Sequence, residues 1–285
     1  MSGKRCERNS VLKKWLKVGD EMKRWTSVDI KRMKGEKPWA MLTAYDALSA
    51  SWVEATGLPA VLVGDSLGMT SLGYESTLPV TMDEMVHHTA AVARGVDRAL
   101  VIADMPFMSY QSSISCGLAN AGRFLKDAGA DAVKVEGGSI RAELIEALVE
   151  NGIPVLAHIG LTPQSVKELG GYRVQGTNSE AAQRIMDDAM AVEQAGAFAV
   201  VLECVPAELS AQITKALSIP TVGIGAGSSC DAQVLVISDV LGLSRKAVPS
   251  FVKPFAQLAP QIEEALAEFK AAVESGAFPD ENQSY

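Results

Sequence analysis

The sequence predicts an α/β protein built as a single (β/α)8 TIM barrel with an N-terminal helical extension. Eight short apolar runs recur along the 285-residue chain, which is the pattern of parallel strands covered on both faces. Stretches rich in Ala, Leu and Glu separate these runs and indicate helices. A doubly wound open sheet would show the same alternation, but a count that reaches eight favours the barrel.

The predicted strands are short and rich in Val, Ile, Leu and Ala. They are residues 39–45, 60–65, 100–106, 132–137, 154–160, 198–204, 220–225 and 233–239. Gly-containing junctions at 129–131 and 195–197 separate a helix from the next strand, and such glycines suit the left-handed cap that ends a helix.

The predicted outer helices include residues 113–128, 139–151, 180–195 and 207–217. Thr81 and Glu84 form a capping-box pattern that opens another helix. Pro254 precedes a helical pattern over 255–275, which we assign as the last outer helix of the barrel. Residues 161–180 form a long irregular connection after the fifth strand, and such a loop in a compact barrel is usually functional or a lid.

Charge divides the chain into a basic extension and an acidic body. Residues 1–37 carry 12 Lys and Arg and 5 Asp and Glu, a net charge of +7, whereas the remainder carries 14 basic and 29 acidic residues, a net charge of −15. An acidic body argues against nucleic acid as a partner. The extension suits a solvated or interface helix better than a targeting signal, although both readings stay open. We expect an extension at 1–37, a catalytic barrel at 38–279 and a tail at 280–285.

No apolar run is long enough to span a membrane, and the N-terminus lacks a secretory apolar region. The four cysteines, at 6, 116, 204 and 230, are too widely spaced for a zinc or redox motif. We therefore expect reduced thiols in a cytoplasmic protein with no membrane partner.

Charged side chains gather at the predicted strand ends. In the stretch DAVKVEGG, Lys134 and Glu136 stand two apart on a strand and so share one face. Other strands end in the same way, and the full set is Asp65, Asp104, Lys134, Glu136, His158 and Glu203. In a barrel these ends converge on one mouth, where the active sites of this fold lie.

Each of these residues also has a purely structural interpretation. A lone Asp after a strand is commonly a helix cap, and Lys134 and Glu136 can make an ordinary ion pair. A single His can be a buried core residue whose hydrogen bonds are all made within the protein. Four carboxylates in one mouth are harder to explain, since two charges 4 Å apart interact by about 4 kcal/mol at an effective dielectric near 20. Their repulsion calls for protonation or for a cation.

The ligand chemistry favours Mg²⁺, with Mn²⁺ as an alternative, because the available atoms are carboxylate oxygens without thiolates. We expect Asp65 and Asp104 to bind the ion directly and Glu136 to lie close by. Glu203 would then act as general base beside a carbonyl that the metal polarises, so that an enolate forms. Ser66, Lys134 and His158 would receive an anionic group of the substrate.

Several motifs together resemble the ketopantoate hydroxymethyltransferase family. They are MLTAYDALSA, VLVGDSLGMTSLGYESTLPVTMDEM, ADMPFMSY, AVKVEGG, HIGLTPQSV followed by GGYRVQG, VLECVP and GIGAG. The resemblance runs from about residue 38 to 279. One departure is Ala232 in the segment SSCDAQ, where the family pattern leads us to expect glycine.

The resemblance implies a barrel of the phosphoenolpyruvate/pyruvate type. It implies transfer of a one-carbon unit from 5,10-methylenetetrahydrofolate to 3-methyl-2-oxobutanoate, with Mg²⁺, in pantothenate and coenzyme A biosynthesis. It also implies a homodecamer of two stacked pentamers.

By motif, Asp65 and Asp104 match residues that bind both metal and substrate, and Glu136 matches the acid beside the metal. Ser66 and Lys134 match groups that hold the substrate carboxylate, Glu203 matches the base, and His158 matches a substrate contact. Two alternative functions remain at this point: that of a lyase or phosphonomutase-type relative, and that of a binding or assembly protein that keeps the barrel without catalytic activity.

Overall fold

The computed structural model describes residues 23–244 and 248–285, and within these residues eight parallel strands close into a barrel in chain order. The strands are β1 (Trp39–Thr43), β2 (Ala60–Val63), β3 (Leu100–Asp104), β4 (Ala132–Glu136), β5 (Val155–Gly160), β6 (Ala199–Glu203), β7 (Thr221–Ile224) and β8 (Ala232–Leu235). Each strand pairs in parallel with its sequence neighbour, and β1 pairs with β8. The predicted fold class is confirmed, and the open sheet is excluded.

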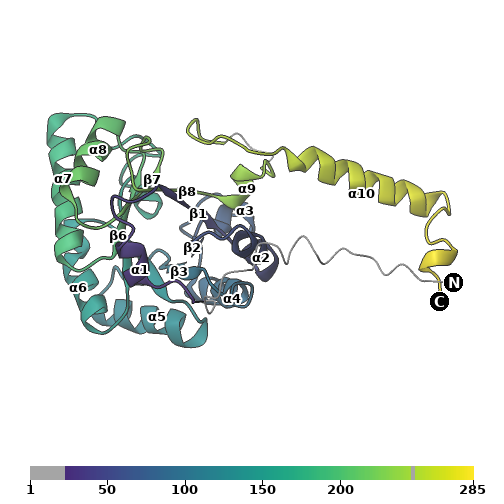
Figure 1. The fold of residues 1–285 in the computed structure, drawn as a ribbon, viewed down its shortest axis with the longest axis horizontal. Coiled ribbons are helices and arrows are strands. Elements are labelled where there is room, and N and C mark those ends of the chain that lie inside the picture. The colour runs from purple at the N-terminus through teal and green to yellow at the C-terminus, as the bar shows by residue number, and fades with distance from the viewer. Residues whose placement is uncertain (1–22, 245–247) are drawn as a thin grey trace.

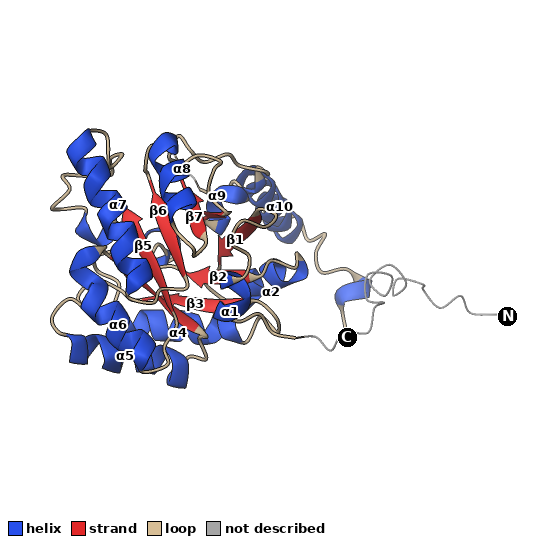
Figure 2. Ribbon diagram, turned by 60° about the vertical axis from the view of Figure 1, so that its left-hand side comes forward, coloured by secondary structure: helices blue, strands red, loops and turns tan. Residues whose placement is uncertain are grey.

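Helices cover the outside of this barrel (Figure 1). They are α2 (Ala47–Ala55), α4 (Met82–Ala93), α5 (Ile114–Asp127), α6 (Ala142–Glu150), α7 (Ser179–Gln194) and α8 (Ala207–Ala216). The short helices α3 (Leu67–Thr70) and α9 (Ile237–Val240) instead contribute to the cavity at the mouth, and one-turn 3-10 helices lie at Ser139–Arg141 and Pro163–Ser165. The capping box predicted for α4 is present, since Thr81 and Glu84 bond each other's backbone N–H. Figure 2 shows α5, α6 and α7 packed along the outer face of the strands.

Two apolar cores follow from the alternation of side chains along each strand. One core lies between strands and helices and contains residues such as Val63, Phe124 and Leu148, all fully buried. The other fills the barrel interior with residues such as Met41, Ile102 and Leu156. The interior is therefore a packed core, and the cavity described below lies toward the carboxyl ends of the strands.

The described part of the N-terminal extension closes the opposite end of the barrel. Residues 23–37, here called the N-terminal plug, contain the short helix α1 (Ser27–Lys31), whose Ile30 is 1% exposed in the inner core. Arg24 pairs with Asp131, and Lys34 pairs with Asp231, both of which lie just before strands. The helical extension predicted for residues 1–22 lies outside the described residues.

The assignment of 255–275 as the last outer helix is wrong. A helix does form there, α10 (Leu258–Glu274), but it has no buried residue and leads away from the barrel (Figure 1). The reason is that an amphipathic pattern predicts that a helix buries its apolar face, but not against which surface. After β8 the chain instead forms α9, and the start of α10 hydrogen-bonds to the end of α9, from Leu258 N–H to the Leu241 carbonyl.

Candidate active site

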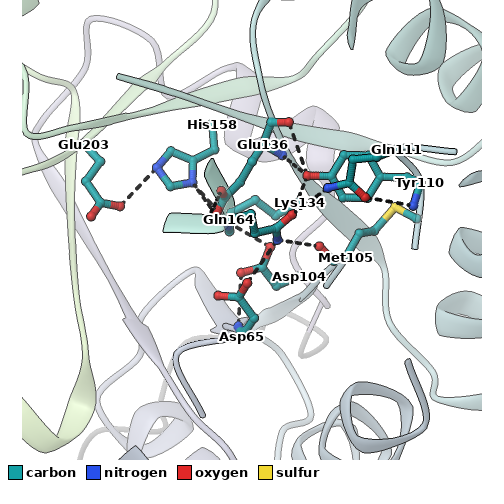
Figure 3. Close-up of polar contacts among 10 residues, drawn as sticks. All are labelled: Asp65, Asp104, Met105, Tyr110, Gln111, Lys134, Glu136, His158, Gln164 and Glu203. Carbon is teal, nitrogen blue, oxygen red and sulfur yellow. Dashed lines mark hydrogen bonds and ion pairs between the residues drawn. The ribbon is translucent and has the colours of Figure 1, made fainter. Parts of the chain in front are cut away.

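Three buried carboxylates meet at the carboxyl ends of neighbouring strands. Asp65 follows β2, Asp104 ends β3 and Glu136 ends β4, and one oxygen from each lies within 4.8 Å of the others. The exposed fractions are 4%, 2% and 4%. These residues, here called the acidic cluster, lie at the centre of Figure 3.

Lys134 offsets part of this negative charge. Its Nζ lies 2.9 Å from Asp104 Oδ1 and 3.4 Å from Glu136 Oε1. Burial alone would lower the pKa of Lys134, but Asp104, Glu136 and Asp65 outweigh it and raise this pKa above its ordinary value. Lys134 therefore stays charged and can neutralise only one of the three carboxylates.

The pKa values of the three carboxyls in the acidic cluster shift in different directions. Burial raises the pKa of Asp65 well above its ordinary value, and the charges of Asp104 and Glu136 add to the rise. Burial also raises the pKa of Asp104. For Glu136 burial acts in the same sense, but Lys134 and a hydrogen bond from His158 prevail and lower its pKa to about 2. The raised pKa values of Asp65 and Asp104 mean that ionising all three carboxylates together is unfavourable without a further cation.

The acidic cluster fits a hard divalent cation. Its donor atoms are all carboxylate oxygens, the ligands that Mg²⁺ and Mn²⁺ prefer. Asp104 Oδ1 is also buried without a well-directed hydrogen bond, although it is ion-paired with Lys134. An oxygen in that state has a lone pair available for a metal.

His158 on β5 links the acidic cluster to Glu203 at the end of β6. Its Nε2 lies 3.1 Å from Glu203 Oε2, and its Nδ1 lies 3.0 Å from Lys134 Nζ. Burial and Lys134 act to lower the pKa of His158, but hydrogen bonds to Glu136 and Glu203 raise it above its ordinary value. Glu203 is less buried than the cluster, with 16% of its side chain exposed, so its carboxylate borders the cavity.

Ser66 stands on the other side of Asp65, at the start of α3, where its side chain makes no cap hydrogen bond. Its Oγ is 2.9 Å from the hydroxyl of Tyr45, which in turn accepts a hydrogen bond from Thr43. Ser66 therefore presents its hydroxyl to the cavity with a fixed neighbour.

Sequence reasoning missed Gln164, whose amide joins two members of the acidic cluster. Its Nε2 donates to Asp65 Oδ2 at 3.0 Å and to the Met105 carbonyl at 2.8 Å, while its backbone N–H donates to Glu136 Oε2 at 3.0 Å. Its Oε1 accepts from Tyr110 and Gln111. The available signal was its place in the unusual loop after β5, beside Pro163.

All the predicted site residues line one cavity of about 740 Å³. Asp65, Ser66, Asp104, Lys134, Glu136, His158 and Glu203 all contribute to its wall. The loop at 161–178 adds Tyr172, whose hydroxyl lies 3.8 Å from Met69 Sδ, and both residues line the cavity. The structure thus brings the predicted residues together, while their individual roles stay predictions.

The fold and this site define a class of protein: a (β/α)8-barrel enzyme with a carboxylate centre of the metal-binding type at its mouth. Solved structures share the fold. The 2,3-dimethylmalate lyase matches with a TM-score of 0.60, 15% identity and coverage of 91% of this chain and 92% of its own. A phosphoenolpyruvate phosphomutase from Streptomyces platensis subsp. rosaceus matches with a TM-score of 0.59, 16% identity and coverage of 88% of each chain. At this identity the likeness shows the fold alone.

Sequence comparison identifies the family. The family model described as ketopantoate hydroxymethyltransferase matches residues 24–281, so the match includes nearly all of the N-terminal plug. A 3-methyl-2-oxobutanoate hydroxymethyltransferase from Syntrophus aciditrophicus (strain SB) is 56% identical over 89% of this chain and 93% of its own length. A second one, from Carboxydothermus hydrogenoformans, is 56% identical over 93% of this chain and 96% of its own length. The chain belongs to the ketopantoate hydroxymethyltransferase family and is an enzyme.

Proposed function

We propose that the enzyme transfers a hydroxymethyl group from 5,10-methylenetetrahydrofolate to 3-methyl-2-oxobutanoate, forming ketopantoate on the route to pantothenate and coenzyme A. The observation that supports this most strongly is the single cavity in which the acidic cluster faces Glu203 through His158. The relatives at 56% identity carry the name of this reaction. A lyase or mutase activity has only the shared fold in its favour.

Asp65, Asp104 and Glu136 would hold Mg²⁺, which when bound supplies Lewis acidity to the oxo group of the substrate. Ser66 and Lys134 are placed to bind the substrate carboxylate, because both border the cavity beside Asp65 and Asp104. His158 is the remaining polar group between Lys134 and Glu203, and it contacts the substrate from β5.

Glu203 acts as the general base. Its carboxylate removes the C3 proton of the oxo acid, and the electron pair of that C–H bond becomes the enolate double bond. The contact of 3.1 Å between His158 Nε2 and Glu203 Oε2 restricts the orientation of the Glu203 carboxylate. The enolate carbon then forms a bond to the one-carbon unit of the folate, water supplies the hydroxyl group of the product, and the two C–N bonds of the unit break. Tetrahydrofolate leaves with both nitrogens protonated, one by the proton that Glu203 removed and the other by the second proton of water.

We also propose a cytoplasmic homodecamer built of two pentamers, as the family resemblance implies. The oligomer has support from α10, whose apolar side chains Ile262, Leu266, Phe269 and Val273 are 48–63% exposed. Among the described residues, no helix is long and apolar enough to cross a membrane. The described cysteines, Cys116, Cys204 and Cys230, are free thiols, as a reducing compartment requires.

Proton exchange tests the first half of this reaction. The enzyme is incubated in D₂O with 3-methyl-2-oxobutanoate, and the C3 proton is followed by NMR with Mg²⁺ and then with EDTA. We expect metal-dependent loss of the proton signal, and ketopantoate once 5,10-methylenetetrahydrofolate is added. Glu203→Gln should slow exchange by roughly 10²–10⁴-fold.

Two controls make the exchange experiment decisive. Asp104→Ala should lose Mg²⁺-dependent exchange, and full exchange by this variant in EDTA would overturn the metal assignment. If the wild-type enzyme neither exchanges the proton nor forms ketopantoate with both substrates and Mg²⁺ present, the proposed function is wrong.

A further inference from the structure

The cavity has a second half that the chemistry above does not use. The acidic cluster, Lys134, His158 and Glu203 occupy the ends of β2 to β6. A cavity of about 740 Å³ lies in the range of roughly 300–1,000 Å³ that suits drug-sized ligands, far more than a small branched oxo acid requires. The remaining wall is formed at the ends of β7, β8 and β1.

This second wall is mainly apolar and aromatic. Ile224 from β7 and Leu235 from β8 line its inner part, and Trp52 from α2 lies further out with 49% of its surface exposed. Phe251 packs against Gly225 just beyond β7, so closely that an added Cβ would lie 2.8 Å from the Phe251 ring. A flat ring system would find both shape and dispersion contacts here.

Two carboxylates interrupt this apolar wall, Asp46 and Asp239, and they differ in their partners. Asp239 lies on α9, directly after β8, and lines the cavity in a half-buried position. Within the described residues its carboxylate has no hydrogen-bond or ion-pair partner, in contrast to Asp46, which caps α2 at the same mouth. Burial raises the pKa of Asp239, the response of a carboxylate that has lost water and gained no donor.

We propose that the wall at the ends of β7, β8 and β1 binds the pterin ring of the folate cosubstrate, with Asp239 accepting hydrogen bonds from its 2-amino group and adjacent ring N–H. This inference rests on the proposed function. The pterin edge offers two parallel N–H donors, and a carboxylate accepts such a pair in a bidentate manner. The ring then lies against the apolar wall beside Glu203, since Ile224 of that wall is the neighbour of Glu203 on the adjacent strand.

The location agrees with the chemistry of transfer. Tyr45, buried at the end of β1, is near enough to Asp239 for this charge to contribute to the raised pKa of its hydroxyl, an effect that burial dominates. Tyr45 also contacts Ser66, which borders the acidic cluster. Asp239 and the oxo-acid site are therefore neighbours across Tyr45, and a ring bound at Asp239 can bring its one-carbon unit over the substrate.

The test separates folate binding from the chemistry of the oxo acid. Tetrahydrofolate is titrated into wild type and Asp239→Asn by calorimetry in the presence of Mg²⁺ and 3-methyl-2-oxobutanoate. We expect the dissociation constant to rise about 10- to 100-fold in Asp239→Asn, since hydrogen bonds to a charged group are lost and an unmatched NH₂ faces the ring. C3-proton exchange without folate should persist in this variant, which shows that it is folded.

Asp46→Asn is the matched control, because it removes the same charge from the same mouth while Asn still caps the helix. Its tetrahydrofolate affinity should match that of wild type. Equal affinity in Asp239→Asn and wild type would overturn the inference while exchange leaves the proposed function intact, and so would an equal loss in both variants. If wild type exchanges no proton and binds no tetrahydrofolate, the proposed function and the inference fall together.

Discussion

At the scale of the residue, Gln164 shows how an uncharged group can organise a charged centre. Its 4% exposed amide donates to Asp65 while its backbone N–H donates to Glu136, so one residue positions two members of the acidic cluster. Tyr110 and Gln111 fix which end of the amide faces Asp65, because both donate to its oxygen. Such partners tune ligand orientation in metal sites.

Gln164→Leu should weaken metal binding more than it weakens the fold. The substitution removes the donor to Asp65, so this carboxylate loses its fixed orientation, while the Tyr110 hydroxyl keeps the Glu136 carbonyl as an acceptor. We expect the dissociation constant for Mn²⁺, measured by electron paramagnetic resonance, to rise about 10- to 100-fold. The melting temperature should fall only modestly.

Gln111→Leu is the comparison for this experiment, since Gln111 belongs to the same network but donates to Gln164 and not to the cluster. Its effect on Mn²⁺ affinity should be several times smaller. Wild-type affinity in Gln164→Leu would contradict a positioning role for this amide.

The charged members of the site could be predicted from the sequence, whereas Gln164 and Tyr45 could not. An Asp or Glu at the end of an apolar strand interrupts the apolar pattern and can therefore be recognised in the sequence. Gln164 lies in a polar loop where glutamine is ordinary, and its contacts with Asp65 reach across 99 positions of the chain. Only the closed barrel brings these segments together.

At the scale of the element, the strands were predictable because each is a short apolar run bounded by polar turns. The predicted ends of the second and third strands, 65 and 106, extend two residues beyond β2 and β3, since the residues there already bend into the mouth. The eighth predicted strand, 233–239, is cut short because Ile237 opens α9. These end effects are local, whereas the placement of α10 depends on a partner surface that no local pattern encodes.

The N-terminal plug has a second buried anchor in Asp231, which lies directly before β8. Its carboxylate accepts hydrogen bonds from Lys34 Nζ at 2.9 Å, the Gly35 N–H at 3.0 Å and the Thr221 N–H at 2.8 Å. Burial acts to raise the pKa of Asp231, but these hydrogen bonds prevail and lower it below the ordinary value. A lowered pKa means that the folded state favours the charged carboxylate.

Asp231→Ala should destabilise the enzyme by about 2–4 kcal/mol at neutral pH, because it leaves the Gly35 and Thr221 N–H groups without their acceptor and Lys34 without its ion-pair partner. Since the pKa is lowered in the folded state, the wild-type advantage is complete above the unfolded value of about 3.9 and is lost as the pH falls further. Denaturant unfolding at neutral and acidic pH would show the gap between the two proteins narrowing. The exposed Asp97→Ala should match wild type throughout, and a constant gap for Asp231→Ala would contradict this account.

At the scale of the whole molecule, α10 carries an apolar stripe that its own barrel does not cover. The stripe repeats at helical spacing through Ile262, Leu266, Phe269 and Val273. Phe269 contacts Phe278 beyond the helix end, at 5.6 Å between ring centroids, yet remains 56% exposed. A monomer would present this surface to water, so an assembled state is expected to cover it.

Leu266→Glu combined with Phe269→Glu should reduce the size of the assembly. Two charges in the centre of the stripe would oppose burial against another copy. Light scattering after size exclusion should show wild type as a homo-oligomer and the double variant as a smaller species. Glu264→Lys, on the opposite face of α10, is the control and should keep the wild-type mass. A monomeric wild type, or an unchanged double variant, would refute this role for α10.

The N-terminal plug also closes one end of the barrel. Trp25, Ile30 and Met33 pack into the core at one end, so both substrates must use the same opening at the other. The acidic cluster is buried at the strand ends, whereas Asp239 on α9 is only half-buried, which is expected of a residue nearer that opening. We therefore expect ordered binding and release: the oxo acid binds before the folate, and the folate leaves before ketopantoate. Product-inhibition kinetics would display this as a compulsory order.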